Sequence, residues 1–257
     1  MTSDAFAHHP DLRGLITDPD RSALRGFDPQ ALAASRPELA LEAFLTPAAK
    51  REGLRRAALA DWQGDLWVFG YGSLMWDPAF RFAELRRAHV ADHARRFILK
   101  DTFGGRGTAD QPGMLAALDD GAGCDGLVFR IAAADVADET EILWRREMAG
   151  PAYHAAFVTA DTAAGQVRAL AFTADHTSAA IVGDISRADQ VRYIATGAGF
   201  FGSSLDYLTN IATHFAVLGI DDAEVAGLMR ETAAYLADHP VTGIAPDRPL
   251  NRNGGAG

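Results

Sequence analysis

The stretch Leu66-Trp67-Val68-Phe69-Gly70-Tyr71-Gly72-Ser73-Leu74 begins the strand-rich part of the chain. Its first four residues are apolar and are followed by glycine, a pattern that predicts a short buried strand running into a tight loop. Glycine lets a backbone bend sharply and approach a ligand, and successive N–H groups in such a turn can form an anion site. Glycine turns at strand ends are common, so the pattern by itself favours an ordinary strand-to-loop turn.

Five further segments predict strands by their runs of apolar and β-branched residues. They are Arg95 to Leu99, Met114 to Leu118, Leu127 to Ile131, Ala155 to Thr159 and Val167 to Thr173. The stretch between the second and third of these is rich in Asp and Gly and predicts a hairpin. Ala164-Gly165 predicts a turn between the last two strands.

Helices are predicted before and after this strand-rich region. Asp28-Pro29 and Thr46-Pro47 each place a capping residue before proline at the first helical position, and the second of these helices is expected to run to about Trp62. Residues 1–27 show no clear period and are interpreted as an arm of uncertain order. The N-terminal part of the chain is therefore expected to be partly helical.

A helix is expected to begin at Asp135 and to end near Gly150-Pro151, and three more are expected from Ser186 onward. Ser186 and Asp189 have the spacing of a capping box. Strands in the middle and helices at both ends predict an α+β fold with a mostly antiparallel small β-barrel or sheet flanked by helices. A doubly wound fold is not expected.

The composition limits the partners that the protein can have. The chain has 257 residues, with 34 acidic against 24 basic residues and a net charge of −10. Nucleic acid is not expected as a partner, because phosphate binding needs a basic footprint. The single cysteine excludes an intramolecular disulfide and zinc sites built on several thiolates. No membrane span is expected, since no stretch approaches about 18 uninterrupted apolar residues, and the polar start does not resemble a signal peptide.

Three other patterns resemble ligand sites but lack the required context. The spacing of Gly197, Gly199 and Gly202 matches a dinucleotide loop, but the segment before it predicts a helix rather than a strand, so a helix C-cap and turn are expected. His89 and His93 have metal-ligand spacing for a helix, yet no third ligand is evident and four arginines surround them. Cys124 lies in a Gly/Asp-rich turn with no histidine partner, which favours a structural thiol.

Glu147 is the most informative single residue. The inward stripe of the helix expected after Asp135 comprises Val136, Thr140, Leu143 and Glu147. A carboxyl group thus occupies a position where a core residue is expected, near a helix C-terminus whose dipole disfavours negative charge. Both effects suit a general base. The alternative is a structural glutamate paired with Arg145 or Arg146.

Several motifs together resemble the ChaC-type γ-glutamylcyclotransferases. The motifs are Trp67 to Trp76, Arg106-Gly107-Thr108, Gln111-Pro112-Gly113, Leu143-Trp144-Arg145-Arg146-Glu147-Met148, Tyr153 and Tyr207-Leu208. The resemblance spans roughly residues 65–220. It implies a γ-glutamylcyclotransferase-like catalytic domain over 65–240, an N-terminal extension over 1–64 and a C-terminal tail over 241–257.

The resemblance also implies a function and a site. In this family the signature loop binds the γ-glutamyl part of the substrate and the glutamate of the Arg-Glu element accepts a proton. The implied catalytic residue is Glu147. The implied substrate-binding residues are Val68, Phe69, Gly70, Tyr71, Gly72, Ser73, Leu74, Arg106 and Tyr153. Arg106 is expected to attract the anionic peptide, and Tyr153 to hydrogen-bond the substrate or orient Glu147.

The implied reaction is the cleavage of glutathione to 5-oxoproline and cysteinylglycine in the cytoplasm, without a metal or cofactor. Three alternatives stay open at this point. The substrate could be another γ-glutamyl amino acid or amine, the chain could be a non-catalytic regulator linked to cation transport, or it could be a binding module that uses the barrel as a scaffold. An intact loop and an intact Glu147 favour the enzyme over the regulator.

Overall fold

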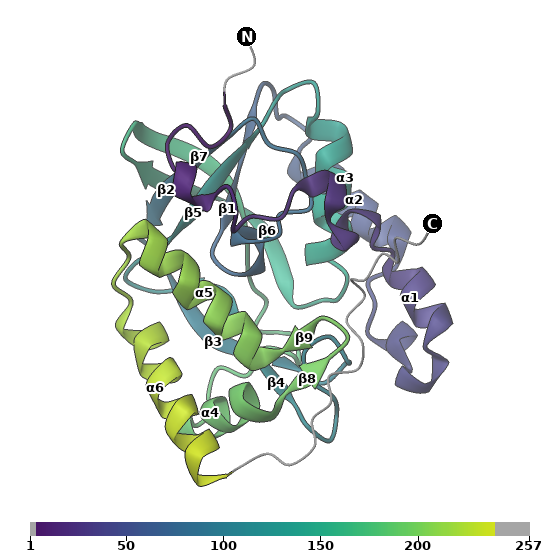
Figure 1. Cartoon of the computed structure of the whole chain (residues 1–257). Coiled ribbons are helices and arrows are strands. Elements are labelled where there is room, and N and C mark those ends of the chain that lie inside the picture. The colour runs from purple at the N-terminus through teal and green to yellow at the C-terminus, as the bar shows by residue number, and fades with distance from the viewer. Residues whose placement is uncertain (1–3, 240–257) are drawn as a thin grey trace, which may run out of the picture.

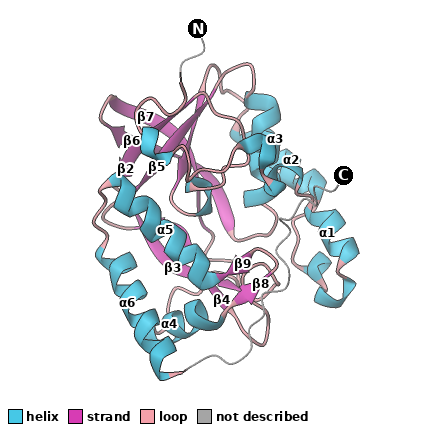
Figure 2. Cartoon of the chain, in the orientation of Figure 1, coloured by secondary structure: helices cyan, strands magenta, loops and turns pink. Residues whose placement is uncertain are grey.

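The computed structural model describes residues 4–239 and places seven strands of this region in one sheet (Figures 1 and 2). The strands are β1 Leu66–Gly70, β2 Glu84–Val90, β3 His93–Asp101, β4 Gly113–Asp120, β5 Cys124–Ile131, β6 Tyr153–Thr162 and β7 Gly165–Ala174. All six predicted strands are present within these bounds. The predicted turn at Ala164-Gly165 connects β6 to β7, which pair antiparallel along their whole length.

The sheet closes on itself to form a barrel. The strand order is β1-β5-β2-β6-β7-β4-β3, and β1 also pairs in parallel with β7. Strands β1, β5, β2, β6 and β7 therefore form a closed five-stranded barrel, while β4 and β3 continue outward from β7. The pairs β1–β7 and β4–β7 are parallel and the others antiparallel, so the predicted α+β fold with a mostly antiparallel barrel is confirmed.

The predicted hairpin between Met114–Leu118 and Leu127–Ile131 is wrong. β4 pairs with β3 and β7, whereas β5 pairs with β1 and β2. The turn is real, and Gly123 adopts a φ of 138°, which favours glycine. It redirects the chain, however, so that β5 enters the barrel while β4 stays outside it.

Strand β2 was missed because its centre carries the charged pair Arg86-Arg87. Charged residues interrupt the apolar pattern by which strands are recognised. The structure shows how this pair is accommodated at the barrel surface. The Arg86 guanidinium lies over the Trp67 ring, 4.7 Å from its centroid.

The helices lie on two sides of the barrel (Figure 1). They are α1 Pro29–Ser35, α2 Ala48–Ala58, α3 Val136–Glu147, α4 Arg187–Thr196, α5 Ser204–Leu218 and α6 Ala223–Asp238. Single turns of 3-10 helix occur at η1 Pro10–Leu12, η2 Pro19–Arg21, η3 Ala23–Gly26, η4 Pro37–Leu39, η5 Leu41–Ala43 and η6 Ser73–Met75. A two-stranded ribbon of β8 Ala198–Gly199 and β9 Gly202–Ser203 precedes α5.

Most predicted helix starts are confirmed. The Asp28 side chain caps α1, and the Ser186 hydroxyl accepts the backbone N–H of Asp189 at the start of α4. Pro47, rather than Thr46, is the N-cap of α2, which ends at Ala58 before reaching Trp62. The full reciprocal capping box lies at α5, between Ser203 and Asp206.

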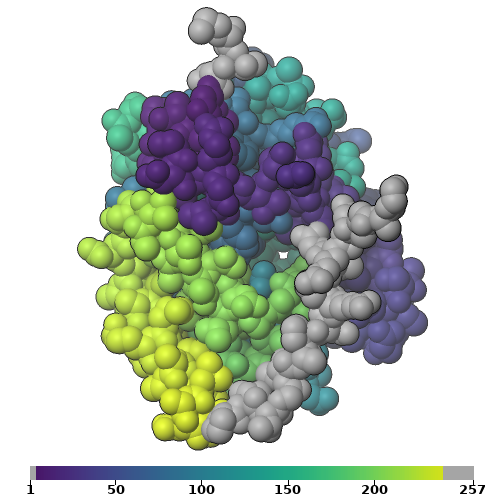
Figure 3. Space-filling view, in the orientation of Figure 1, coloured from purple at the N-terminus to yellow at the C-terminus, as the bar shows by residue number. Residues whose placement is uncertain are grey.

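The N-terminal segment packs against the barrel. Leu12 is fully buried and joins the main core together with Ile16, so the described part of residues 1–27 is ordered by core contacts. In the space-filling view the purple N-terminal residues lie directly on the body of the protein, above α5 (Figure 3). The helical N-terminal extension is thus present. The domain boundary at 64/65 stays a prediction, and the predicted tail 241–257 lies outside the described residues.

The three patterns rejected as ligand sites lie in regular elements of the described chain. Gly197 is the C-cap of α4, and Gly199 and Gly202 pair in the β8–β9 ribbon. His89 and His93 lie on strands β2 and β3, and no group of three metal-binding side chains is found among residues 4–239. Cys124 is buried as the first residue of β5. No helix in the described part of the chain is long and apolar enough to cross a bilayer.

Candidate active site

A cavity of about 440 Å³ lies beside the C-terminal end of α3, and four of the predicted site residues line it. These four are Ser73, Arg106, Glu147 and Tyr153. The other predicted residues do not line the cavity. Val68 and Leu74 are buried in the main core and Phe69 and Tyr71 in a second cluster. Gly70 and Gly72 are buried as well.

Glu147 is the last residue of α3, and its side chain is 14% exposed. Its carboxylate accepts a hydrogen bond from Arg146 Nε at 2.7 Å. The same guanidinium donates to Ser73 Oγ at 2.8 Å and to the carbonyl oxygen of Asp77. Arg146 therefore links Glu147 to the glycine loop. The pairing considered as the structural alternative is present, and it holds the carboxylate at the cavity wall.

Three tyrosines lie near enough to this carboxylate to feel its charge: Tyr71 and Tyr207 are buried, and Tyr153 is partly buried. Burial raises the pKa of Tyr71 and of Tyr153 well above the ordinary value, and the nearby negative charge of Glu147 acts in the same direction. Burial also raises the pKa of Tyr207 to about 12. All three phenols are therefore protonated at neutral pH and able to donate hydrogen bonds. Tyr71 Oη donates to the carbonyl oxygen of Phe172 at 2.9 Å.

Tyr207 was not among the predicted site residues, although it lines the cavity from α5. The Tyr207-Leu208 pair is one of the motifs that resemble the ChaC-type family, and this motif could have identified Tyr207 as a site residue. The Tyr207 phenol also explains why residue 72 of the loop is a glycine. A Cβ atom added at Gly72 would overlap Tyr207 Oη, so only glycine fits beside this side chain without a shift.

Arg106 lies between β3 and β4 and brings positive charge to the cavity. Its guanidinium donates to the carbonyl oxygen of Ser203 at 2.9 Å and lies 5.5 Å from the centroid of the Tyr207 ring. Burial lowers the pKa of Arg106, while Tyr207 and nearby carboxylates oppose this effect. Its backbone N–H is fixed by the side chain of Asp101, whose pKa burial raises.

The N-terminal extension supplies a wall of the cavity, which sequence reasoning missed entirely. The wall residues from this segment are apolar: Ala23, Leu24, Phe27, Pro29, Leu32, Leu41, Phe44 and Leu45. Local sequence gives no signal for this arrangement, because it depends on where the extension docks.

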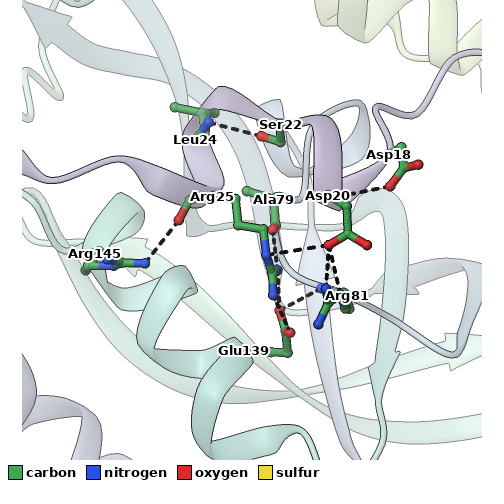
Figure 4. Close-up of polar contacts among 9 residues, drawn as sticks. All are labelled: Asp18, Asp20, Ser22, Leu24, Arg25, Ala79, Arg81, Glu139 and Arg145. Atoms are coloured by element: carbon green, nitrogen blue, oxygen red, sulfur yellow. Dashed lines mark hydrogen bonds and ion pairs between the residues drawn. The ribbon is translucent and has the colours of Figure 1, made fainter.

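A buried ion pair docks the extension on the helix that carries Glu147 (Figure 4). Arg25 donates to both carboxylate oxygens of Glu139, at 2.7 and 2.8 Å, and Glu139 also accepts the backbone N–H of Arg81 at 2.8 Å. Arg145 donates to the carbonyl oxygen of Arg25 at 3.0 Å. Since Glu139 and Glu147 are about two turns apart on α3, one helix positions both the carboxylate and the cavity wall.

Comparisons with known proteins identify the family of the chain. The family model described as ChaC-like protein matches residues 66–235. The chain is 32% identical over 206 residues to a protein of Escherichia coli (strain K12) named glutathione-specific gamma-glutamylcyclotransferase, a match that covers 79% of this chain and 89% of that protein. It is 32% identical over 159 residues to glutathione-specific gamma-glutamylcyclotransferase 1 of Rattus norvegicus, covering 60% of this chain and 71% of that one.

Among solved structures, a gamma-glutamyl cyclotransferase specific to glutathione from yeast superposes with a TM-score of 0.63. The superposition covers 69% of this chain and 99% of the yeast chain at 21% sequence identity, and it shows a shared fold. The family match extends from the first strand of the barrel into the last described helix, α6. On the strength of these matches, the chain belongs to the ChaC-like protein family.

Proposed function

We propose that the protein is a γ-glutamylcyclotransferase that cleaves glutathione to 5-oxoproline and cysteinylglycine. The observation that carries this proposal is the Glu147 carboxylate, held by Arg146 at the wall of a cavity that also contains Arg106. The names of the relatives from Escherichia coli and Rattus norvegicus support glutathione as the substrate.

The chemistry is an internal aminolysis. The α-amino nitrogen of the γ-glutamyl unit attacks the γ-carbonyl carbon of the same unit, a five-membered lactam forms, and the C–N bond to cysteine breaks. The attacking nitrogen needs a lone pair, so Glu147 takes a proton from it and then returns a proton to the leaving nitrogen. The reaction as written consumes no water and no redox equivalent. Because the attack is intramolecular, holding the chain in a folded conformer provides much of the acceleration.

The other polar groups have supporting roles in this proposal. Arg146 orients the Glu147 carboxylate, and Ser73 anchors Arg146 in turn. Arg106 attracts a carboxylate of the anionic peptide, and the protonated Tyr153 donates a hydrogen bond to the substrate or to Glu147. The side chains of Val68, Phe69 and Leu74 are buried in the core clusters, and the Tyr71 phenol donates to the carbonyl oxygen of Phe172. Gly70 and Gly72 have no side chain. The proposed contribution of these loop residues is therefore through the backbone, whose N–H groups hold the α-carboxylate or the developing oxyanion.

The test is Glu147→Gln, which keeps the shape of the side chain and removes its basicity. Pure protein is incubated with reduced glutathione, and 5-oxoproline and cysteinylglycine are quantified. We expect both products from the wild type and a loss of at least about a hundredfold in kcat from the variant. Glu141→Gln is the matched control, since Glu141 is exposed on the same helix.

A fully active Glu147→Gln variant would show that Glu147 is not the proton acceptor. If the wild type releases no 5-oxoproline from any γ-glutamyl compound, the proposal of an enzyme fails. A non-catalytic regulator then becomes the better hypothesis. A cytoplasmic location stays part of the proposal, because the cytosol is the compartment where glutathione keeps thiols reduced.

A further inference from the structure

Glu147 is the last residue of α3, so the proposed base lies at an end of a helix. The last four carbonyl groups of a helix have no partner within it, and helix ends fray. Beyond Glu147 the chain turns through residues 148–152 and reaches Tyr153 at the start of β6. Residues 149–153 all line the cavity. A restraint on this short connection would therefore fix both of the polar side chains that it joins.

The N-terminal extension supplies such a restraint. The backbone N–H of Thr46 donates to the carbonyl oxygen of Ala149 at 2.7 Å, two residues beyond Glu147. On the other side of Glu147, the Arg145 side chain donates to the carbonyl oxygen of Arg25 at 3.0 Å, as Figure 4 shows. Hydrogen bonds from the extension therefore hold the chain on both sides of the proposed base.

The Thr46 carbonyl group is held in turn by a buried arginine. Arg51 on α2 is 6% exposed, and its guanidinium donates to the carbonyl oxygen of Thr46 and to Gln30 Oε1, each at 3.2 Å. Gln30 Nε2 donates to the same carbonyl oxygen at 3.2 Å. The two side chains thus form a closed network around a single backbone carbonyl group, that of Thr46.

This network places a positive charge in the interior without a countercharge beside it. The hydrogen-bond partners of Arg51 are neutral, and no carboxylate among the described residues forms an ion pair with it. Burial lowers the pKa of Arg51, against the attraction of Asp28. Because an unpaired buried charge opposes folding, stability alone does not account for Arg51. Its hydrogen bonds do, however, give Thr46 a fixed position.

We propose that the N-terminal extension positions the catalytic carboxylate, and that Arg51 is the positioning residue, acting through Thr46 and Ala149. The inference rests on the proposed function of Glu147. Arg51 does not line the cavity, so it acts through the backbone and not on the substrate. A displacement of about 1 Å can cost about a hundredfold in rate when catalysis depends on holding groups in place. The family match begins at residue 66, so this device lies outside the matched region.

The experiment measures kcat and KM for 5-oxoproline release from reduced glutathione by the wild type, Arg51→Met and Arg51→Lys. Methionine keeps an unbranched apolar side chain and removes every donor, whereas lysine keeps an ammonium donor. We expect Arg51→Met to lower kcat about tenfold with KM nearly unchanged, and Arg51→Lys to recover part of this loss. Gln30→Met is a milder change in the same network and should lower kcat less than Arg51→Met does.

Arg55→Met is the matched control. Arg55 lies about one turn further along α2, and its guanidinium donates to the carbonyl oxygen of Ala137 at 3.1 Å and to Thr140 Oγ1 at 3.0 Å. It therefore attaches α2 to the beginning of α3, and Ala137 is about 15 Å from Glu147 along the helix axis. Both substitutions weaken the attachment of α2 to its surroundings, but only Arg51→Met should lower kcat.

A second background separates positioning from a purely structural role. A smaller folded fraction lowers every rate, including the residual rate of Glu147→Gln. Positioning acts through the carboxylate, so Arg51→Met should lower the residual rate of Glu147→Gln far less than it lowers the rate of the wild type. Urea unfolding of each variant establishes that it is folded under the assay conditions.

Three results would overturn the inference while the proposed function stands. They are a wild-type kcat in Arg51→Met, an equal loss of kcat in Arg55→Met, and an equal effect of Arg51→Met in the two backgrounds. If the wild type releases no 5-oxoproline from glutathione, or if Glu147→Gln is fully active, the proposed role of Glu147 is wrong, and this inference is overturned with it.

Discussion

Replacing Arg25 by methionine is expected to destabilise the whole protein, because it leaves Glu139 as a buried carboxylate without its cation. The Glu139 side chain is 3% exposed and accepts three hydrogen bonds, two of them from Arg25. Hydrogen bonds to charged groups contribute about 1.5–3 kcal/mol each, and removing one partner of a buried pair costs about 3–5 kcal/mol. Arg25 is itself 22% exposed, so water offsets part of the loss, and we expect about 3 kcal/mol.

The assay is urea unfolding of the wild type, Arg25→Met, Glu139→Gln and the double variant. A double-mutant cycle then gives the coupling between the two side chains, for which we expect at least about 1.5 kcal/mol. Arg56→Met is the control, because Arg56 is 77% exposed and forms a surface pair with Glu52. Such surface pairs contribute less than about 1 kcal/mol.

The result that would refute this reasoning is an Arg25→Met variant no less stable than Arg56→Met, or a coupling near zero. Either outcome would mean that the extension is held by its apolar contacts, such as those of Leu12, and not by the ion pair. A biphasic transition would show instead that the protein unfolds as more than one cooperative unit.

Three further predictions concern the loop, the phenols and the thiol. Gly72→Ala should cost about 1–3 kcal/mol of stability by overpacking, and adding Tyr207→Phe should recover part of this, since the oxygen that the new Cβ overlaps is removed; urea unfolding measures both. Because burial raises the pKa of Tyr207 to about 12, its contribution to stability is full below about pH 10 and is lost as the pH rises toward 12. Unfolding at about pH 9 and about pH 11 should therefore show a smaller loss in Tyr207→Phe than in the wild type, and equal losses would contradict the burial argument. Burial raises the pKa of Cys124 to about 11, so a thiol reagent at about pH 8 should label it only after denaturation, and rapid labelling of the native protein would count against this.

Local pattern was sufficient to predict those parts of the protein that depend on neighbours in sequence. The apolar run and glycines at residues 66–72 predicted β1 and its loop, and the helical period predicted α3, which ends at Glu147 on the cavity wall. These features follow from strand and helix geometry, which repeat every two or every 3.6 residues. A carboxyl group that interrupts the apolar stripe of a helix can therefore be recognised from the sequence pattern alone.

Features that depend on distant segments were not predicted. Glu139 lies on the same helix as Glu147, yet its partner Arg25 is 114 residues away. The partner of β4 could not be deduced from the turn that follows it, because the turn fixes the direction of the chain and not the strand beside which it docks. The apolar wall was missed for the same reason, since its residues gain a role only where the extension meets the loops carrying Phe103 and Phe201.

The parallel pairing of β1 with β7 has a consequence for the protein as it is synthesised. Trp67 and Val68 contact Ala169 and Leu170, so a nascent chain lacks the strand that closes its barrel until residues near 170 have left the ribosome. Until then β1 has an unpaired edge, which is a template for aggregation, and the loop between two distant strands must close before their contacts repay the entropy. Glu147 is translated well before this moment. A chain stalled between α3 and β7 would therefore contain every residue of the proposed acid/base element and still have no site in which to use it.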